Sequence, residues 1–558
     1  MSRLAQILSA LAAALLAAEA VGAETPPPVA AGEIIELPKF EVTDTRVLPP
    51  PESWHYATVP GFEILSNISA RETKRFVNDF LLLQEAVTVL MPGLTGTDVA
   101  VPTRLLLCGR GNGFNRFMPD DRGDDIYRTN SLFFDDPERA AIVVDFALAE
   151  LQLDAATTIE ADPYRGFYKE YFRHLIRRQV GRHCPVWFEE GLVEMFSAID
   201  FNKKWITFAQ IGDGFGGGKD NDFNQMLTQR ALLPLPEMFA REVITSDRFW
   251  SAQCYAFVHM CLYGRGQRYQ AGMVKFVNRL GTEPPTEELF QECFKKSYKD
   301  MALELRGYLD FTDHKYIQFT AKKGQALPEP PPAALREATE AEVGRITGET
   351  LRLGGHGDAA HLALIAPYIR GAREPQLLAA LGLDERIAGH DDRAQKFLEA
   401  AAQAEVVRPR AYLELARLRF AAAKAADGAD LTPAQVAAVL APLAAARSQP
   451  PPMAEVFELT TEVWAHSARP PTRDDLAVIN QGVGFFPRRA LLLARAAELN
   501  LRHGDPETAR KIITHALRIV PASPARLALE QLRDELPPPP MPPPTPPAPA
   551  PAAAAPKP

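Results

Sequence analysis

Phe167–Ser197 reads FYKEYFRHLIRRQVGRHCPVWFEEGLVEMFS, and this stretch decides how the first half of the chain is interpreted. It predicts two helices joined by a short loop. On the first helix, Glu170 and His174 are four residues apart. On the second, Glu190 and Glu194 have the same spacing. Residues four apart share one face of a helix, so two antiparallel helices would bring Glu170, His174 and Glu190 around one point.

The residues on either side predict an α+β domain that is helical at its C-terminal end. Ser69 and Glu72 form a capping-box pattern for a helix that runs to about Leu90. Pro163 and Pro185 begin the two helices of the motif. Short apolar runs typical of buried strands occur at 62–65, 104–107 and 141–144. Further helices are predicted at 251–262, 271–280, 286–294 and 298–308.

Pro185–Ser197, PVWFEEGLVEMFS, resembles the P-x-W-x-x-E-G-L-A-E-x-x-S segment of gluzincin metallopeptidases of the peptidase MA-like type. In that family an upstream helix carries H-E-x-x-H, often as H-E-Y-x-H-L, where this chain has EYFRHL. The resemblance covers Trp54–Tyr308 and includes SAQCYAFVHMCLYG at 251–264 and KSYKDMALELRGYL at 296–309. It implies a zincin-like α+β domain rich in helices, in which two His and one Glu would hold zinc.

Aligned on His174, the chain departs from the family motif. The first His of the family becomes Glu170, and the catalytic Glu becomes Tyr171. The third ligand, the Glu before Gly-Leu, is retained as Glu190, and Glu194 matches the carboxylate that supports the metal ligands. The resemblance therefore implies a metal triad of Glu170, His174 and Glu190.

A competing register aligns Glu170 with the catalytic Glu of the family. Lys169 and Arg173 then fall at the two His positions. Because two cations cannot ligate zinc, this register leaves no metal site.

The His/Glu/Glu triad changes the chemistry even if it binds zinc. Carboxylate oxygens do ligate zinc, but a second carboxylate leaves about zero net charge on the metal, so a bound water is acidified less. Tyr171, with a reference pKa near 10, is a poor general base at pH 7. We therefore favour a degenerate, non-hydrolytic peptidase-like domain. The alternative is an active zinc metallopeptidase with a non-standard His/Glu/Glu site.

For both pairs of residues on these helices, a structural interpretation without chemistry remains open. Glu170 and His174 also fit an ordinary helix pair with no metal, since several nearby arginines offer salt-bridge partners. Tyr255 and His259, four residues apart on a later helix, would point into the same cleft if they stabilise an oxyanion, as in some gluzincins. His259 also fits a core histidine with a satisfied hydrogen bond.

The first 23 residues predict an exported protein, periplasmic or secreted. Arg3 precedes an apolar run, and Val21-Gly22-Ala23 provides a cleavage site with small residues. The run is too short to span about 30 Å of hydrocarbon, and no later stretch is apolar enough, so we expect no transmembrane segment in the mature chain.

The formal charge of −9 and pI of 5.8 exclude the electrostatic footprint of a nucleic-acid partner. Five cysteines are interpreted mainly as core residues, with one disulfide left open.

Changes in composition divide the rest of the chain. The Pro-rich leader contains one strand-like piece, Ile34–Val42. The predicted parts are a signal peptide at 1–23, the leader at 24–53, the peptidase MA-like domain at 54–320, a linker at 321–334, an all-α helical domain at 335–536 and a disordered Pro/Ala-rich tail at 537–558.

The helical domain carries a partial repeat that resembles tetratricopeptide repeats. The clearest copy is Ala490–Ser523, in which Ala497, Ala509 and Ala516 have the usual spacing and Pro521 follows. Small residues at these positions let two helices cross closely. We expect a scaffold that binds an unidentified protein or peptide through the repeats.

Overall fold

The computed structural model describes residues 35–40, 48–91, 100–109, 113–119, 130–147, 163–180, 184–202, 204–208, 223–244, 247–280, 283–310, 317–320, 331–427 and 430–538. The predicted signal peptide, most of the predicted linker and residues 539–558 of the predicted tail lie outside this set. Across the described ranges, no helix combines the length and the apolar character needed to cross a bilayer. The fold confirms an α+β region followed by a helical region.

The chain divides into two compact units. The first comprises residues 1–426 together with 437–456, and the second comprises 427–436 together with 457–558. The sheet and the residues of the motif helices all belong to the first unit.

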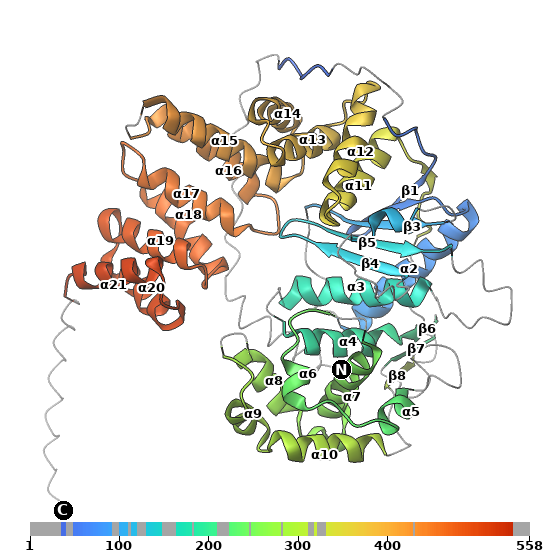
Figure 1. Cartoon of the computed structure of the whole chain (residues 1–558). Helices are drawn as coiled ribbons and strands as arrows, with labels where there is room; N and C mark the ends of the chain where they lie inside the picture. The colour runs from blue at the N-terminus through green and yellow to red at the C-terminus, as the bar shows by residue number, and fades with distance from the viewer. Residues whose placement is uncertain are drawn as a thin grey trace, which may run out of the picture. The chain divides into compact units, whose positions relative to one another are not determined.

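The first unit is built on a six-stranded mixed sheet of order β4-β5-β3-β2-β1-β9 (Figure 1). The neighbours β2, β3 and β5 are parallel, and the remaining pairs are antiparallel. Gly61, with φ of +77°, allows the tight turn between β1 and β2. The strands are β1 (His55–Val59), β2 (Phe62–Ser66), β3 (Thr103–Cys108), β4 (Ser131–Asp135), β5 (Ala140–Asp145) and β9 (Arg336–Glu337).

Both faces of this sheet are buried, because successive side chains of a strand point to opposite faces. Ile64 and Leu105 belong to the core formed with α2 (Ala70–Leu90) and α3 (Pro163–Val180). Leu65 and Leu106 pack instead with residues of α11 (Glu340–Leu353) and α12 (Gly357–Ile369). The first helices after the predicted linker therefore cover the second face of the sheet (Figure 1).

A buried charge network ties α11 to the sheet. The carboxylate of Glu349 lies 3.1 Å from Arg104 Nη2 and 3.2 Å from Arg139 Nη1. Arg408 Nη1 is 2.6 Å from the same carboxylate, and Arg345 Nη1 is 3.9 Å away. Only 2% of Glu349 is exposed. Arg104 is on β3, so the contact links the middle of the sheet to the helical region.

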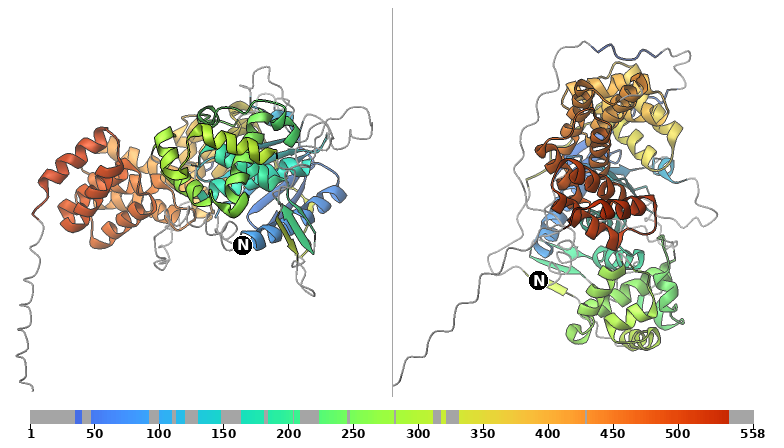
Figure 2. Two further views of the ribbon diagram at one scale, coloured as in Figure 1. Left: turned by 90° about the horizontal axis from the view of Figure 1, so that it is seen from below. Right: turned by 90° about the vertical axis from the view of Figure 1, so that its left-hand side faces the viewer.

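On the other side of α3, away from the sheet, lies a helical layer that Figures 1 and 2 show in green. Within it, α4 packs on α7 through Gly191, where a Cβ atom would lie 2.6 Å from Val258 Cγ2. The layer contains α4 (Val186–Ser197), α5 (Phe223–Thr228), α6 (Leu235–Phe239), α7 (Arg248–Tyr263), α8 (Gln270–Leu280), α9 (Glu287–Phe294) and α10 (Tyr298–Leu309). A small antiparallel sheet accompanies it, with β6 (Asp200–Phe201), β7 (Trp205–Phe208) and β8 (Ile317–Thr320).

Among the later helices, α13 packs against α14, and α19 packs against α20. Ala497, Ala509 and Ala516 of the best predicted repeat are buried between α19 and α20. The helices are α13 (Pro375–Ile387), α14 (Asp391–Gln403), α15 (Pro409–Asp427), α16 (Pro433–Arg447), α17 (Ala454–Ala465), α18 (Arg473–Phe485), α19 (Ala490–His503), α20 (Pro506–Ile519) and α21 (Pro524–Glu535).

One detail differs from the sequence predictions. In the strand-like piece Ile34–Val42, the described residues 35–40 form no strand. They lie along helices of the first unit, where Tyr368 donates a side-chain hydrogen bond to the backbone of Pro38. The five cysteines are buried and free.

Candidate functional site

The charged residues of the motif gather where α3 packs on α4. α3 begins at Pro163, whose fixed φ suits the first turn of a helix. α4 follows Pro185 and is buried from Trp187 to its last residue. Its carboxylates Glu189, Glu190 and Glu194 are therefore removed from water, and each needs a compensating partner.

Arg173 binds three carboxylates at once. Its Nε donates to Glu170 Oε2 at 3.0 Å, and its Nη1 donates to Glu189 Oε1 at 2.9 Å. Its Nη2 donates to Glu190 Oε2 at 3.1 Å. Burial opposes ionisation of Glu190, but the charges of Arg173 and Lys169 hold its pKa below the ordinary value. Burial alone would lower the pKa of Arg173, yet the three carboxylates raise it.

Two further carboxylate oxygens of α4 accept hydrogen bonds, whereas Glu194 Oε2 accepts none from the described residues. Ser251, on α7, donates a hydrogen bond to Glu190 Oε1 at 2.9 Å. Lys169 Nζ donates to Glu194 Oε1, and Arg165 Nη2 lies 4.0 Å from Glu194 Oε2. Glu190 and Glu194 thus each contact a cation from α3.

His174 does not join these carboxylates. Its Nε2 lies 3.2 Å from Thr103 Oγ1 on β3. Its ring packs edge-on against Phe62 and Phe133, with centroids 5.6 and 6.1 Å away. Burial, helped by the charge of Arg178, lowers the pKa of His174 to about 3. The imidazole is therefore a neutral group at the interface of α3 with the sheet.

Tyr171 is a core residue. Only 1% of it is exposed, and its ring contacts Phe62, Phe80 and Phe167 at centroid distances of 5.8, 5.2 and 5.8 Å. Burial raises the pKa of the Tyr171 hydroxyl well above its ordinary value. A hydroxyl that resists deprotonation in this environment is poorly suited to act as a general base.

Tyr255 and His259 lie on α7 within the helical layer. Their ring centroids are 5.8 Å apart, and both residues are buried. His259 Nδ1 lies 2.7 Å from the hydroxyl of Tyr308 on α10, which satisfies the ring nitrogen in the core. Burial raises the pKa of Tyr255, and the charge of Glu194 raises it further.

The predicted triad does not fit zinc in this arrangement. In the part of the chain that the structure describes, no three His, Cys, Asp or Glu side chains are grouped so that they could hold a metal ion. Zinc requires its donor atoms about 2 Å from one point. Glu170 and Glu190 are brought together, but on the guanidinium of Arg173, and His174 bonds elsewhere. A cation among the carboxylates repels a metal ion by simple electrostatics.

Two of these cations are the residues that the competing register places at the His positions. Lys169 and Arg173, which fall at the two His positions in that register, contact Glu194 and Glu190. Sequence reasoning missed Glu189 and Ser251 as members of the site. The adjacent pair Glu189-Glu190 beside an arginine-rich helix was an available signal, because buried carboxylates require cations.

No known protein-family model matches the chain, and no curated protein matches it as a relative.

Proposed function

We propose that this protein is an exported scaffold whose peptidase MA-like domain does not hydrolyse peptides. In this proposal its tetratricopeptide-like helices bind a protein or peptide partner. The observation that carries the proposal is the position of Arg173, which donates to Glu170, Glu189 and Glu190 at 2.9–3.1 Å. A guanidinium has no lone pair for zinc, so the group that would activate water has no place beside Glu190.

The charge balance also supports a structural role for the site. A buried charge pair is strongly destabilising when one partner is removed. Arg173 and Lys169 supply the counter-charges of Glu190 and Glu194, which are 4% and 1% exposed. In a hydrolytic site, those carboxylates would instead face a metal and its water. We infer that the α3–α4 interface has become a support for the fold.

The binding role rests on the helical hairpins. α18 to α21 stack through small and apolar side chains, and Gly482 and Gly504 allow close contacts with Phe457 and Leu476. Stacked hairpins present an extended surface that is suited to a peptide or a protein segment.

Activity and metal content test the proposal. Purified mature protein, incubated with casein and with a mixture of generic peptides, should show no cleavage with or without added zinc. Metal analysis after dialysis should find less than one zinc per chain. Chelator-sensitive hydrolysis that disappears in Glu190→Ala would overturn the proposal and support the alternative, an active metallopeptidase.

Export is tested separately. Cell fractionation of the expressed full chain should place it outside the cytoplasm, and N-terminal sequencing should begin at Glu24. Retention of Met1–Ala23 in a cytoplasmic product would contradict export.

A further inference from the structure

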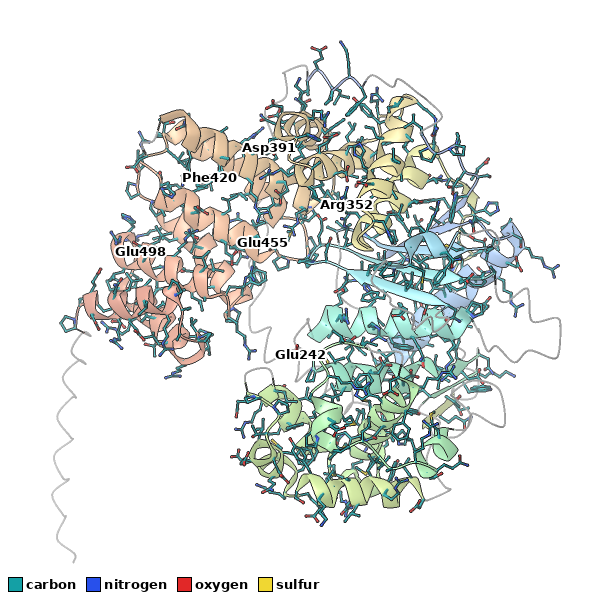
Figure 3. The ribbon with its side chains drawn as sticks, in the orientation of Figure 1. Glu242, Arg352, Asp391, Phe420, Glu455 and Glu498 are labelled. Atoms are coloured by element: carbon teal, nitrogen blue, oxygen red, sulfur yellow. The ribbon has the colours of Figure 1, made fainter. Side chains whose placement is uncertain are left out.

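The leader of the chain lies on the helical hairpins of the first unit. Figure 3 labels Asp391, at the start of α14, and Arg352, near the end of α11, which mark these hairpins. Phe40 packs against Tyr368 of α12 and Phe397 of α14, with ring centroids 5.9 and 6.3 Å away. Arg393 places its guanidinium carbon 5.4 Å from the centre of the Phe40 ring. The aromatic side chain of the leader thus has a pocket made of two rings and a cation.

The same helices also bind the backbone of the leader. The hydroxyl of Tyr368 donates to the carbonyl oxygen of Pro38 at 2.7 Å. Arg370 Nη2 donates to the carbonyl oxygen of Pro49 at 2.5 Å. Proline offers a carbonyl acceptor but no N–H donor, so these two donors suit a proline-containing segment.

A cavity remains beneath the second part of the leader. Residues 49–52 line it together with α11 and α12, and its volume is about 280 Å³. Val343, Leu351 and Leu362 make its walls largely apolar. Thr347, which also lines it, is 5% exposed, and its Oγ1 has no hydrogen-bond partner among the described residues. The resident prolines therefore leave apolar space and one polar group unused.

We propose that the surface formed by α11, α12 and α14 recognises extended, proline-containing segments that carry an aromatic residue. Residues 35–40 and 48–51 are its resident ligand, and a partner segment of the same chemistry binds by displacing them. A larger side chain at the place of Pro49–Pro51 would fill the cavity and reach Thr347. The inference rests on the proposed function, because it names the class of peptide bound, and it places this binding on α11, α12 and α14 of the first unit rather than on α18 to α21.

Tethering explains why displacement is needed. A segment joined to its site by a short linker acts at an effective concentration of the order of millimolar. A free peptide must compete with it, so its apparent affinity for the intact chain is reduced. Weakening the resident segment should restore that affinity without any change to the binding surface.

The experiment uses the full mature chain and a fluorescent peptide with the sequence of residues 35–51, IELPKFEVTDTRVLPPP. Binding is measured by fluorescence anisotropy. We expect Phe40→Ala in the chain to tighten peptide binding at least tenfold relative to the unmodified chain. Leu303→Ala, at an exposed apolar residue of α10, is the matched control and should leave binding unchanged.

A second arm changes the peptide and so avoids any effect on folding. The peptide that carries Phe40→Ala should bind the Phe40→Ala chain at least tenfold more weakly than the unmodified peptide. Adding Tyr368→Phe to that chain should weaken binding of the unmodified peptide several-fold, because the donor to the Pro38 carbonyl is lost.

Equal binding to the unmodified and Phe40→Ala chains, indifference to the Phe in the peptide, or no binding to any chain would each overturn the inference. None of these results involves hydrolysis or metal content. The scaffold proposal would therefore survive them, whereas chelator-sensitive hydrolysis would overturn the scaffold proposal whatever the peptide does.

Discussion

Replacing the two cations of α3 by histidine should create a zinc site. In the double variant Lys169→His with Arg173→His, two imidazoles would lie about one helical turn apart on the face that now contacts Glu190 and Glu194. Two neutral imidazoles and one carboxylate are a suitable donor set for zinc. We expect this variant to bind zinc and the parent chain not to do so.

The size of the effect follows from the contacts that are lost. Without metal, three carboxylates that now bind Arg173 lose their buried cation, which should cost about 3–5 kcal/mol. The side chain of Lys169 is 30% exposed, so its loss should add at most about 1 kcal/mol. Zinc at one hundred times its Kd should then restore about 2.7 kcal/mol. The first unit has roughly 450 residues, so about 1 kcal/mol shifts Tm by about 1 °C. These changes therefore correspond to a fall of about 4–6 °C in Tm and a recovery of about 3 °C.

Thermal unfolding with and without zinc measures both changes. Lys169→Met with Arg173→Met is the matched control, because it removes the same charges and adds no zinc donor. It should be destabilised to a similar extent, but zinc should not rescue it. An equal zinc response in both double variants, or none in the histidine variant, would show that these positions do not face Glu190 as a gluzincin requires. The family resemblance would then have to be withdrawn.

Three further predictions concern the fold. Glu349→Ala should lower the free energy of unfolding, measured in urea, by about 3–5 kcal/mol, because it leaves buried arginines without their shared carboxylate. The control Glu340→Ala changes a residue of the same helix whose side chain is 33% exposed, and it should cost less than about 1 kcal/mol. Burial opposes ionisation of Glu63, but two arginines lower its pKa to about 2. The folded pKa of Glu63 lies below the unfolded value of 4.5, so its carboxylate stabilises the fold by about 3 kcal/mol above pH 5. This stabilisation should be lost as the pH falls toward 2. Urea midpoints that do not change between pH 5 and pH 2 would contradict the prediction. Gly191→Ala should destabilise the chain by about 1–3 kcal/mol through a clash between α4 and α7, whereas Gly307→Ala, with open space around it, should be neutral or slightly stabilising in the same assay.

The sequence predicted helices well where a capping residue or a proline marks the start of the helix. Ser69 caps α2 and accepts a hydrogen bond from the backbone of Glu72, so the capping-box pattern located the start of that helix. β1 and β4 are as long as β2 but were not predicted, because their sequences lack a continuous apolar run and they are held by pairing with β2 and β5. Such pairing is a property of neighbours that are distant in the chain.

In the candidate site too, the local sequence identified the residues, and the packing of distant segments decided their contacts. The sequence supplied its acidic and basic residues, and it left two registers of the family motif open. The two registers differ in whether Arg173 or His174 faces α4. Successive residues on a helix are about 100° apart, so only one of these neighbours can face α4 while the other turns toward the sheet.

The sequence by itself determined the helices with clear caps, the buried central strands and the gathering of charges around α3 and α4. Only the tertiary structure decided the rotation of α3, which places His174 against Thr103 and Arg173 among the carboxylates. It also decided that α11 covers the second face of the sheet and that Phe40 lies on the helical hairpins. These outcomes depend on burying side chains from segments far apart in the chain, and no local pattern encodes which distant surface a helix face will meet.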